Sequence, residues 1–396
     1  MRKWIVGPLR AALLLLVLLV VPVQAEEQRP PAFSGGPEPV KAYAPLWHYG
    51  AYLDLSYDLN FNFPDNHLFR SRTTAQHTNE LDPNMALAYV RKDPTPQSRW
   101  GTEFGLQGGY DTEEFAYQVN QPKVWGHDVW RHVHRANASY LMPVGGKDLT
   151  VTAGLFNSLI GYESLYAKDN FNYTRSWMAD NTPYMMFGVK ASYPVSDELT
   201  ATAYIINGYW HLAYPNSVPS YGIDLEWKPT SKLTVAENIY YGSDQGNTAI
   251  EYWRLYSNFN TEWKSDDVTL SWSYDFGTEQ LATPGGQRAF VMASALFTRW
   301  HIAGPWTVAV RPEFYWDRNG QWTGNQQFVR AITNTVEYKI PYKWTNTLLR
   351  LEYRYDESTG KQGGFFTNGN FANGQPRLTP GQNLLIFSLL WYFDSP

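Results

Sequence analysis

The sequence of 396 residues contains no cysteine. A chain without thiols cannot form disulfide bonds, carry the lipid-modified cysteine of a lipoprotein anchor, or bind a metal ion through thiolates. These three features are therefore excluded.

Long apolar runs are also missing after residue 21. Residues 11–21 are apolar; the basic residues Arg2, Lys3 and Arg10 accompany them, and the small-residue site Val23-Gln24-Ala25 follows, as in a secretory signal peptide. No later stretch reaches the ~18 apolar residues of a membrane-spanning helix. We expect a Sec signal peptide at 1–25, a flexible periplasmic segment rich in proline and glycine at 26–46, and one domain at 47–396. If that domain enters a membrane, strands must form a closed barrel, because a lipid-embedded backbone has to satisfy its own hydrogen bonds.

Basic residues are too few to indicate a nucleic-acid partner. Without Arg2, Lys3 and Arg10 the chain has 29 basic residues against 37 acidic ones, whereas nucleic-acid binding needs clustered positive charge.

Sequence patterns of catalysis are also missing: there is no nucleophile motif, no glycine-rich phosphate loop and no Rossmann pattern. His127, Asp128, His132 and His134 lie close together and could supply a base or metal ligands, but His132 and His134 share a strand face, as alternate residues of any strand do. We therefore expect no enzymatic activity, no cofactor and no metal site.

Apolar and polar residues alternate along much of the chain. In residues 268–276, Val, Leu, Trp, Tyr and Phe occupy one face, and Thr, Ser, Ser and Asp the other. A side-chain period of two is typical of a strand with one apolar and one polar face. The pattern predicts sixteen strands near 47–59, 84–91, 99–108, 131–141, 148–157, 184–193, 198–208, 220–228, 233–241, 252–263, 268–277, 289–300, 306–316, 328–339, 346–356 and 383–393.

The connections between these strands are alternately short and long. Seven short ones are rich in proline, glycine, aspartate and serine, and eight long ones interleave with them. Outer-membrane barrels have short periplasmic turns and long external loops, so both ends of this chain should be periplasmic. The 28 tyrosines and 17 tryptophans are typical of the aromatic girdles of such barrels. The fold class we predict is an all-β transmembrane antiparallel barrel, and a soluble Tyr/Trp-rich carbohydrate-binding sandwich is the other reading of the same alternation.

The polar face of several strands should line the lumen. The pattern places both signs of charge there, and these charges should pair across strands and hold water. The predicted lumen-facing residues are Arg254, Glu262, Arg311, Glu313, Arg350, Glu352 and Arg354.

The third long connection, 158–183, is unusually apolar and aromatic for an exposed loop. Long loops tend to be functional, and in sixteen-stranded porins the third loop folds into the lumen and narrows it. By that analogy Glu163, Lys168, Asp169 and Arg175 would form a charged constriction, with Arg131 and Arg135 facing them across the pore; rings of charge at a narrow point set ion preference. The alternative is an outer cap packed over the mouth of the barrel.

Two stretches are similar to a known family. Residues 50–60, Gly-Ala-Tyr-Leu-Asp-Leu-Ser-Tyr-Asp-Leu-Asn, resemble the opening strand of the OmpL-like beta-barrel porin-2 family, and Gly154–Asn157, Gly161–Glu163, Asn170–Ser176 and Pro183 resemble its central signature. The resemblance implies a pore in the outer membrane of a Gram-negative bacterium, with Gly154, Glu163, Asn172 and Arg175 as signature positions.

The function we predict is a porin-like channel for passive diffusion of small hydrophilic solutes or ions. The alternative is a non-channel outer-membrane barrel, either an enzyme or a surface-binding protein. The expected partners are outer-membrane lipid, lipopolysaccharide and small hydrophilic solutes. A homotrimer is a possible assembly, but the outward faces of the strands are uniformly apolar, so the sequence does not indicate which of them would form the interface.

Overall fold

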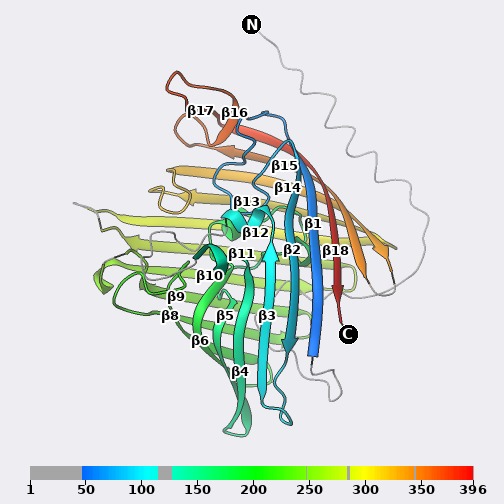
Figure 1. The fold of residues 1–396 in the computed structure, drawn as a ribbon, viewed down its shortest axis with the longest axis vertical. Coiled ribbons are helices and arrows are strands. Elements are labelled where there is room, and N and C mark those ends of the chain that lie inside the picture. The colour runs from blue at the N-terminus through cyan, green and yellow to red at the C-terminus, as the bar shows by residue number, and fades with distance from the viewer. Residues whose placement is uncertain (1–46, 115–126, 247, 283–285, 343–344, 396) are drawn as a thin grey trace.

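The structure, a computed structural model, describes residues 47–114, 127–246, 248–282, 286–342 and 345–395. The predicted signal peptide and periplasmic segment lie outside these residues. Sixteen antiparallel strands form a closed barrel, and a separate two-stranded sheet, β16–β17, stands at one end of it (Figure 1). This confirms the predicted fold class.

The wall strands lie within a few residues of their predicted positions. They are β1 (Trp47–Asn60), β2 (Leu81–Lys92), β3 (Trp100–Gly108), β4 (Val133–Val144), β5 (Lys147–Asn157), β6 (Met185–Pro194), β7 (Leu199–Ile206), β8 (Ser220–Thr230), β9 (Leu233–Ser243), β10 (Trp253–Lys264), β11 (Val268–Gln280), β12 (Arg288–Ala303), β13 (Trp306–Asp317), β14 (Gln327–Pro341), β15 (Asn346–Ser358) and β18 (Gly381–Asp394).

The wall closes where the first strand meets the last. β1 pairs with β18 in a register that runs from Gly50 opposite Asp394 to Asn60 opposite Leu384. Every other pairing joins strands that follow each other along the wall. The start of β1 and the end of β18 therefore lie at the same end of the barrel as the short turns.

The two-residue period decides which face each side chain takes. In β11, Leu270 and Trp272 are exposed on the outer face, while Ser271, Ser273 and Asp275 are buried on the inner one. An outer face of this kind can contact lipid, because the strand hydrogen bonds are already made within the wall.

Aromatic side chains gather near both ends of the strands. At the short-turn end Trp47 meets Trp100 edge to face, with ring centroids 6.0 Å apart, and at the long-loop end Phe290 meets Trp316 at 5.5 Å. Two such belts are what a barrel presents to the two membrane–water interfaces.

The long connections contain structure that the alternation does not predict. They include the helices α2 (Tyr110–Glu114), α3 (His127–Trp130) and α4 (Trp177–Asp180), the 3-10 turns η1 (Ala167–Asp169) and η2 (Ile250–Tyr252), and the hairpin β16 (Phe365–Asn370) and β17 (Pro376–Thr379). Among the described residues, no helix is both long and apolar enough to cross a membrane.

Two long connections enter the barrel: L1, residues 61–80, and L3, residues 158–184. Their apolar side chains, among them Phe69, Leu165, Tyr173 and Trp177, belong to one buried cluster that includes inward-facing wall residues. Loop atoms therefore occupy much of the space between the inward-facing charge pairs. The sequence predicts the entry of the third long loop, L3, but not that of L1.

Candidate functional site: two long loops inside the barrel

L3 crosses the interior from one wall to the opposite one. It leaves β5 and returns to β6, yet its hydrogen bonds reach β13, β14 and β15, which lie on the far side of the ring. On the way the Tyr162 hydroxyl donates to Glu262 of β10 at 2.6 Å, and the Tyr173 hydroxyl donates to Asp54 of β1 at 3.0 Å. L3 is therefore bound to several parts of the wall.

Three wall arginines hold the backbone of L3. Arg311 donates to the carbonyl of Thr174 at 2.7 Å, and Arg354 donates to the carbonyl of Arg175 at 2.8 Å. Arg350 donates to the carbonyls of residues 167 and 170, both at 2.8 Å. A buried loop without regular secondary structure needs partners for its carbonyls, and guanidinium groups supply strong, charge-assisted ones.

Wall carboxylates bind the amides of the same segment. Glu352 accepts from the amides of Tyr173 and Thr174 at 2.6 and 2.9 Å, and Glu313 accepts from the amide of Trp177 at 2.7 Å. The alternation of arginine and carboxylate on β13 and β15 thus matches the alternation of carbonyl and amide in L3. Sequence patterning placed these residues on the inner face but could not reveal that their partner is a loop.

Glu163 lies in this region, but its partner differs from the expected one. It forms an ion pair of 2.9 Å with Arg311 and accepts from the amide of Ser176 at 2.7 Å. Burial raises the pKa of the Glu163 carboxyl, and Arg311 offsets only part of that rise. The pair joins the start of L3 to the far wall.

Arg175 is completely buried, and its side chain joins two parts of L3 to α2. It donates to the carbonyls of Leu165 and Tyr173, and its Nη2 lies 3.5 Å from Asp111 of α2. Burial raises the pKa of Asp111 to about 7, although Arg175 opposes the rise. The guanidinium therefore holds L3 in its folded-back course and links it to α2.

Lys168 and Asp169 lie at the tip of L3, toward the short-turn end of the barrel. Lys168 pairs with Asp169 at 2.8 Å, and its Nζ is 3.9 Å from Asp394 at the end of β18. L3 therefore reaches through much of the depth of the barrel.

The two arginines expected to face L3 are paired with nearby residues. Arg131 forms an ion pair of 2.7 Å with Glu113, and Arg135 forms one of 2.7 Å with Glu103. Asp169 is close enough to Arg135 for their charges to interact. The structure thus brings the tip of L3 near Arg135, while Glu163 and Arg175 lie against Arg311 and Asp111.

Arg254 belongs to a second charged group near the long-loop end. It forms ion pairs of 2.8 Å with both Asp244 and Glu279. Burial would raise the pKa of Asp244, but Arg254 and His211 outweigh it, and the pKa is lowered. This group is separate from the L3 contacts of β13–β15.

L1 is the part of the site that sequence reasoning missed. Arg72 forms a 2.6 Å ion pair with Asp180 of α4, and the amide of Ala75 donates to Asp111 at 2.8 Å. The sequence of L1 is polar and resembles an ordinary external loop, so only its long-range contacts reveal that it lies inside the barrel.

Two cavities border L3. One of about 60 Å³ lies between L3 and β6–β9, with Glu163, Lys190, Asp224 and Asn238 among its lining residues. A second, of about 240 Å³, is lined by residues of L1, L3 and neighbouring loops, including Thr73, Asn181, Trp210, Arg254, Gln321 and Trp322.

The histidines considered as metal or base candidates make separate contacts. His132 Nδ1 lies 3.2 Å from the carbonyl of Gln107, and His134 Nδ1 contacts the hydroxyl of Tyr166 in L3. The side chains of His127 and Asp128 are outside the described part of the structure.

Comparison with known proteins supports a porin-type barrel. The family model "Putative beta-barrel porin-2, OmpL-like" matches residues 47–393. A search of curated proteins found no match.

Solved structures with this fold have low sequence identity to the chain. An anion-selective porin from Comamonas acidovorans has a TM-score of 0.54 at 11% identity, over 88% of this chain and 99% of that one. The trimer form of OmpT of Vibrio cholerae has a TM-score of 0.52 at 11% identity, over 88% and 99%. OmpF of Salmonella typhi in complex with daunomycin has a TM-score of 0.54 at 8% identity, over 88% and 97%.

Proposed function

Because the chain belongs to the Putative beta-barrel porin-2, OmpL-like family, we propose that it is an outer-membrane channel for passive diffusion of small hydrophilic solutes or ions, with L3 as its constriction. The observation that carries the proposal is the course of L3 across a barrel whose inner face is lined with charged and amide side chains. A hydrated solute that passes such a barrel has to pass beside this loop.

The inner face supports polar solutes over apolar ones. Paired guanidinium and carboxylate groups such as Arg311 with Glu313 and Arg350 with Glu337 stay hydrogen-bonded without a solute. These pairs are buried against L3, so the charged groups that would meet a solute are those on the other side of the loop, such as Lys190 and Asp224. A charged side chain at a narrow point selects by charge and size. Glu163, Lys168, Asp169 and Arg175, with Arg131 and Arg135, remain the proposed constriction residues.

The space between L3 and β6–β9 is the path that we propose for solutes. Lys190 and Asp224 line the cavity there, whereas on the opposite side L3 is bound closely to β13–β15. Loosening of L3 from the β6–β9 side would widen this path without breaking the bonds to the far wall.

Single-channel recording tests the proposal. Purified, refolded protein in a planar bilayer should give discrete conductance steps, and no steps at any voltage would contradict it. We also propose that His132 and His134 have no catalytic role in this channel. Their imidazoles contact Gln107 and Tyr166.

A second candidate function is a non-channel barrel, and one observation favours it. L1 and L3 together fill the interior with a buried cluster around Trp177, as a plug for a surface-binding protein would. Liposome swelling with small sugars separates the two candidates, because only a channel lets the sugar enter.

We also propose that the barrel forms a homotrimer in the outer membrane. OmpT of Vibrio cholerae, which shares the fold, is described in a trimer form. Mass measurement of the detergent-solubilised protein by light scattering would show one or three chains per particle.

A further inference from the structure

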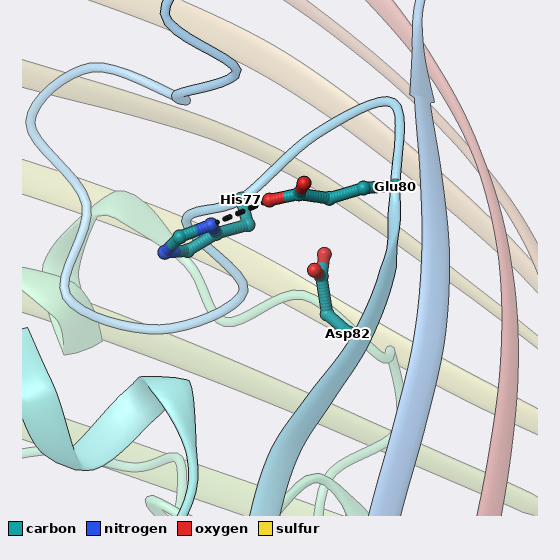
Figure 2. Close-up of side chains that lie close together, drawn as sticks. All are labelled: His77, Glu80 and Asp82. Carbon is teal, nitrogen blue, oxygen red and sulfur yellow. Dashed lines mark hydrogen bonds and ion pairs between the residues drawn. The ribbon is translucent and has the colours of Figure 1, made fainter.

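Three potential metal ligands meet where L1 joins β2. His77 belongs to L1, Glu80 is its last residue, and Asp82 is the second residue of β2. One ligand atom from each lies within 4.8 Å of the other two. Figure 2 shows the imidazole and both carboxylates directed toward a common space.

Asp82 supplies an independent reason to place a cation there. Its side chain is 0% exposed, and neither carboxylate oxygen has a hydrogen-bond partner within the described residues. Asp58, on the neighbouring strand β1, also has an unpartnered oxygen and lies close enough to Asp82 for the carboxylates to repel each other. Buried carboxylates are normally paired or coordinate a metal, so this carboxylate needs a positive partner.

The imidazole is already oriented for binding. The ring of His77 stacks on Tyr110, with centroids 4.2 Å apart and an interplanar angle of 17°. Its Nδ1 faces the carboxylate of Glu80 at 2.8 Å. Stacking on Tyr110 fixes the orientation of the ring, as supporting contacts do in metal sites. Because Nδ1 faces Glu80, a metal bound by both would lie on the Nδ1 side of the ring.

We propose that His77 Nδ1, Glu80 and Asp82 bind one divalent ion of the zinc class, with water in the remaining position. One imidazole and two carboxylates are a ligand set that zinc accepts, whereas calcium and magnesium prefer oxygen ligands alone. Zinc–ligand bonds are about 2.0–2.2 Å long in tetrahedral geometry, which separates the ligand atoms by roughly 3.4 Å. Glu80 would therefore move a few tenths of an ångström away from His77.

The proposed site lies at the end of a loop with an unfavourable backbone. Five of its non-glycine residues have positive φ, at intervals of four: Phe63, His67, Ser71, Ala75 and Asn79. Such conformations persist only where the surroundings enforce them. A metal at the end of L1 adds a fixed point next to Asn79, and through the Arg72–Asp180 ion pair L1 in turn holds α4 of L3. The ion thus has a structural role at the outer rim.

Metal titration of the refolded full-length protein tests this proposal. After treatment with a chelator, calorimetric titration with zinc should show one site per chain that Asp82→Asn and His77→Ala weaken about tenfold or more. His301→Ala is the matched control, because His301 faces Asp267 at 3.7 Å near an exposed short turn and leaves the proposed ligands intact. X-ray absorption of the zinc-loaded protein should show one imidazole nitrogen, with oxygens completing the shell.

The outcomes are distinguishable. Loss of the site in both variants but not in His301→Ala supports the proposal. Equal zinc binding in Asp82→Asn and the unmodified protein overturns it, as does a shell with two or more imidazoles. Equal affinity for magnesium and zinc overturns the assignment to the zinc class. If Asp82→Asn fails to refold, His77→Ala decides the matter, since His77 lies in a loop and is partly exposed.

Discussion

Glu352 connects the wall to L3 with one carboxylate. It accepts hydrogen bonds from the amides of Tyr173 and Thr174 and from the hydroxyls of Thr174 and Thr335, while it remains completely buried. A hydrogen bond to a carboxylate contributes about 1.5–3 kcal/mol, so these bonds anchor L3 to β15. The attachment of L3 inside the barrel thus depends on a few buried carboxylates such as Glu352.

Glu352→Gln should weaken the attachment of L3. The amide retains one acceptor oxygen but places a donor against the Tyr173 or Thr174 amide, so we expect a loss of about 2–4 kcal/mol in the free energy of unfolding, measured with urea in lipid vesicles. L3 should also be cleaved faster by added protease.

Glu357→Gln on the same strand is the matched control. Glu357 pairs with Arg330 at 2.9 Å on the exposed side of the wall, where the two side chains are 39% and 67% exposed. Exposed ion pairs contribute little, so this variant should unfold like the unmodified protein. Equal effects of the two substitutions would show that L3 does not depend on Glu352.

Asp111 should make stability depend on pH. Its pKa is raised to about 7, above the ordinary carboxyl value of about 4, so between these values the folded chain binds more protons than the unfolded one. The contribution of this group is complete below about pH 4 and is lost as the pH rises to about 7. Asp111→Asn should therefore show a smaller fall in unfolding free energy between pH 5 and 8 than the unmodified protein.

Asp197→Asn, in an exposed short turn, is the control for the pH series and should keep the full slope. Identical slopes in Asp111→Asn and the unmodified protein would mean that the Asp111 carboxyl is ionised throughout this range.

At the scale of elements, the sequence predicted strands well and loop positions poorly. Each strand carries its own signal, because a face against lipid and a face against polar atoms impose a period of two on about ten residues. The inward course of L3 had a local signal too, since residues such as Leu159, Tyr162 and Trp177 need something to pack on. Nothing comparable marks L1, whose burial depends on partners such as Asp180 and Asp111, far along the chain.

The contacts that wall residues make across the barrel could not be predicted from the local sequence pattern for the same reason. Arg311, Glu352 and Arg354 can be placed on an inner face by counting alternate residues, but the loop atoms that they bind follow from the three-dimensional course of L3. The His77, Glu80 and Asp82 group could have been noticed as spaced nitrogen and oxygen ligands. The missing hydrogen-bond partners of the Asp82 carboxylate could not have been predicted from the sequence.

Deleting residues 162–176 should raise single-channel conductance. This segment carries the contacts with β10, β14 and β15, and without it the barrel interior is wider. The buried arginines left behind, Arg311 and Arg350, would become hydrated, so we expect a lower unfolding temperature together with the larger conductance. Deleting residues 370–375 of the exposed β16–β17 turn is the control and should change neither quantity. An unchanged conductance in the first deletion would place the conducting path away from L3.

At the scale of the whole molecule, the balance of charge predicts a preference for cations. The chain has a net charge of −5, and the charged residues that line the cavity between L3 and β6–β9 are two carboxylates, Glu163 and Asp224, and one ammonium group, Lys190. Excess charge of one sign in a narrow, poorly screened space concentrates the opposite ion.

The reversal potential in a potassium chloride gradient measures this preference, and we expect the sign that cation selectivity gives. Recordings near 0.1 M salt are suitable, because the Debye length is then about 10 Å, whereas at 1 M it falls to about 3 Å and the effect should shrink. Asp224→Asn removes a carboxylate from the cavity between L3 and β6–β9 and should shift the potential toward zero. Asp266→Asn, in an exposed short turn, should leave it unchanged. An anion-selective potential would show that arginine and lysine side chains dominate the path, and an Asp224→Asn channel with unaltered selectivity would place that path elsewhere in the barrel.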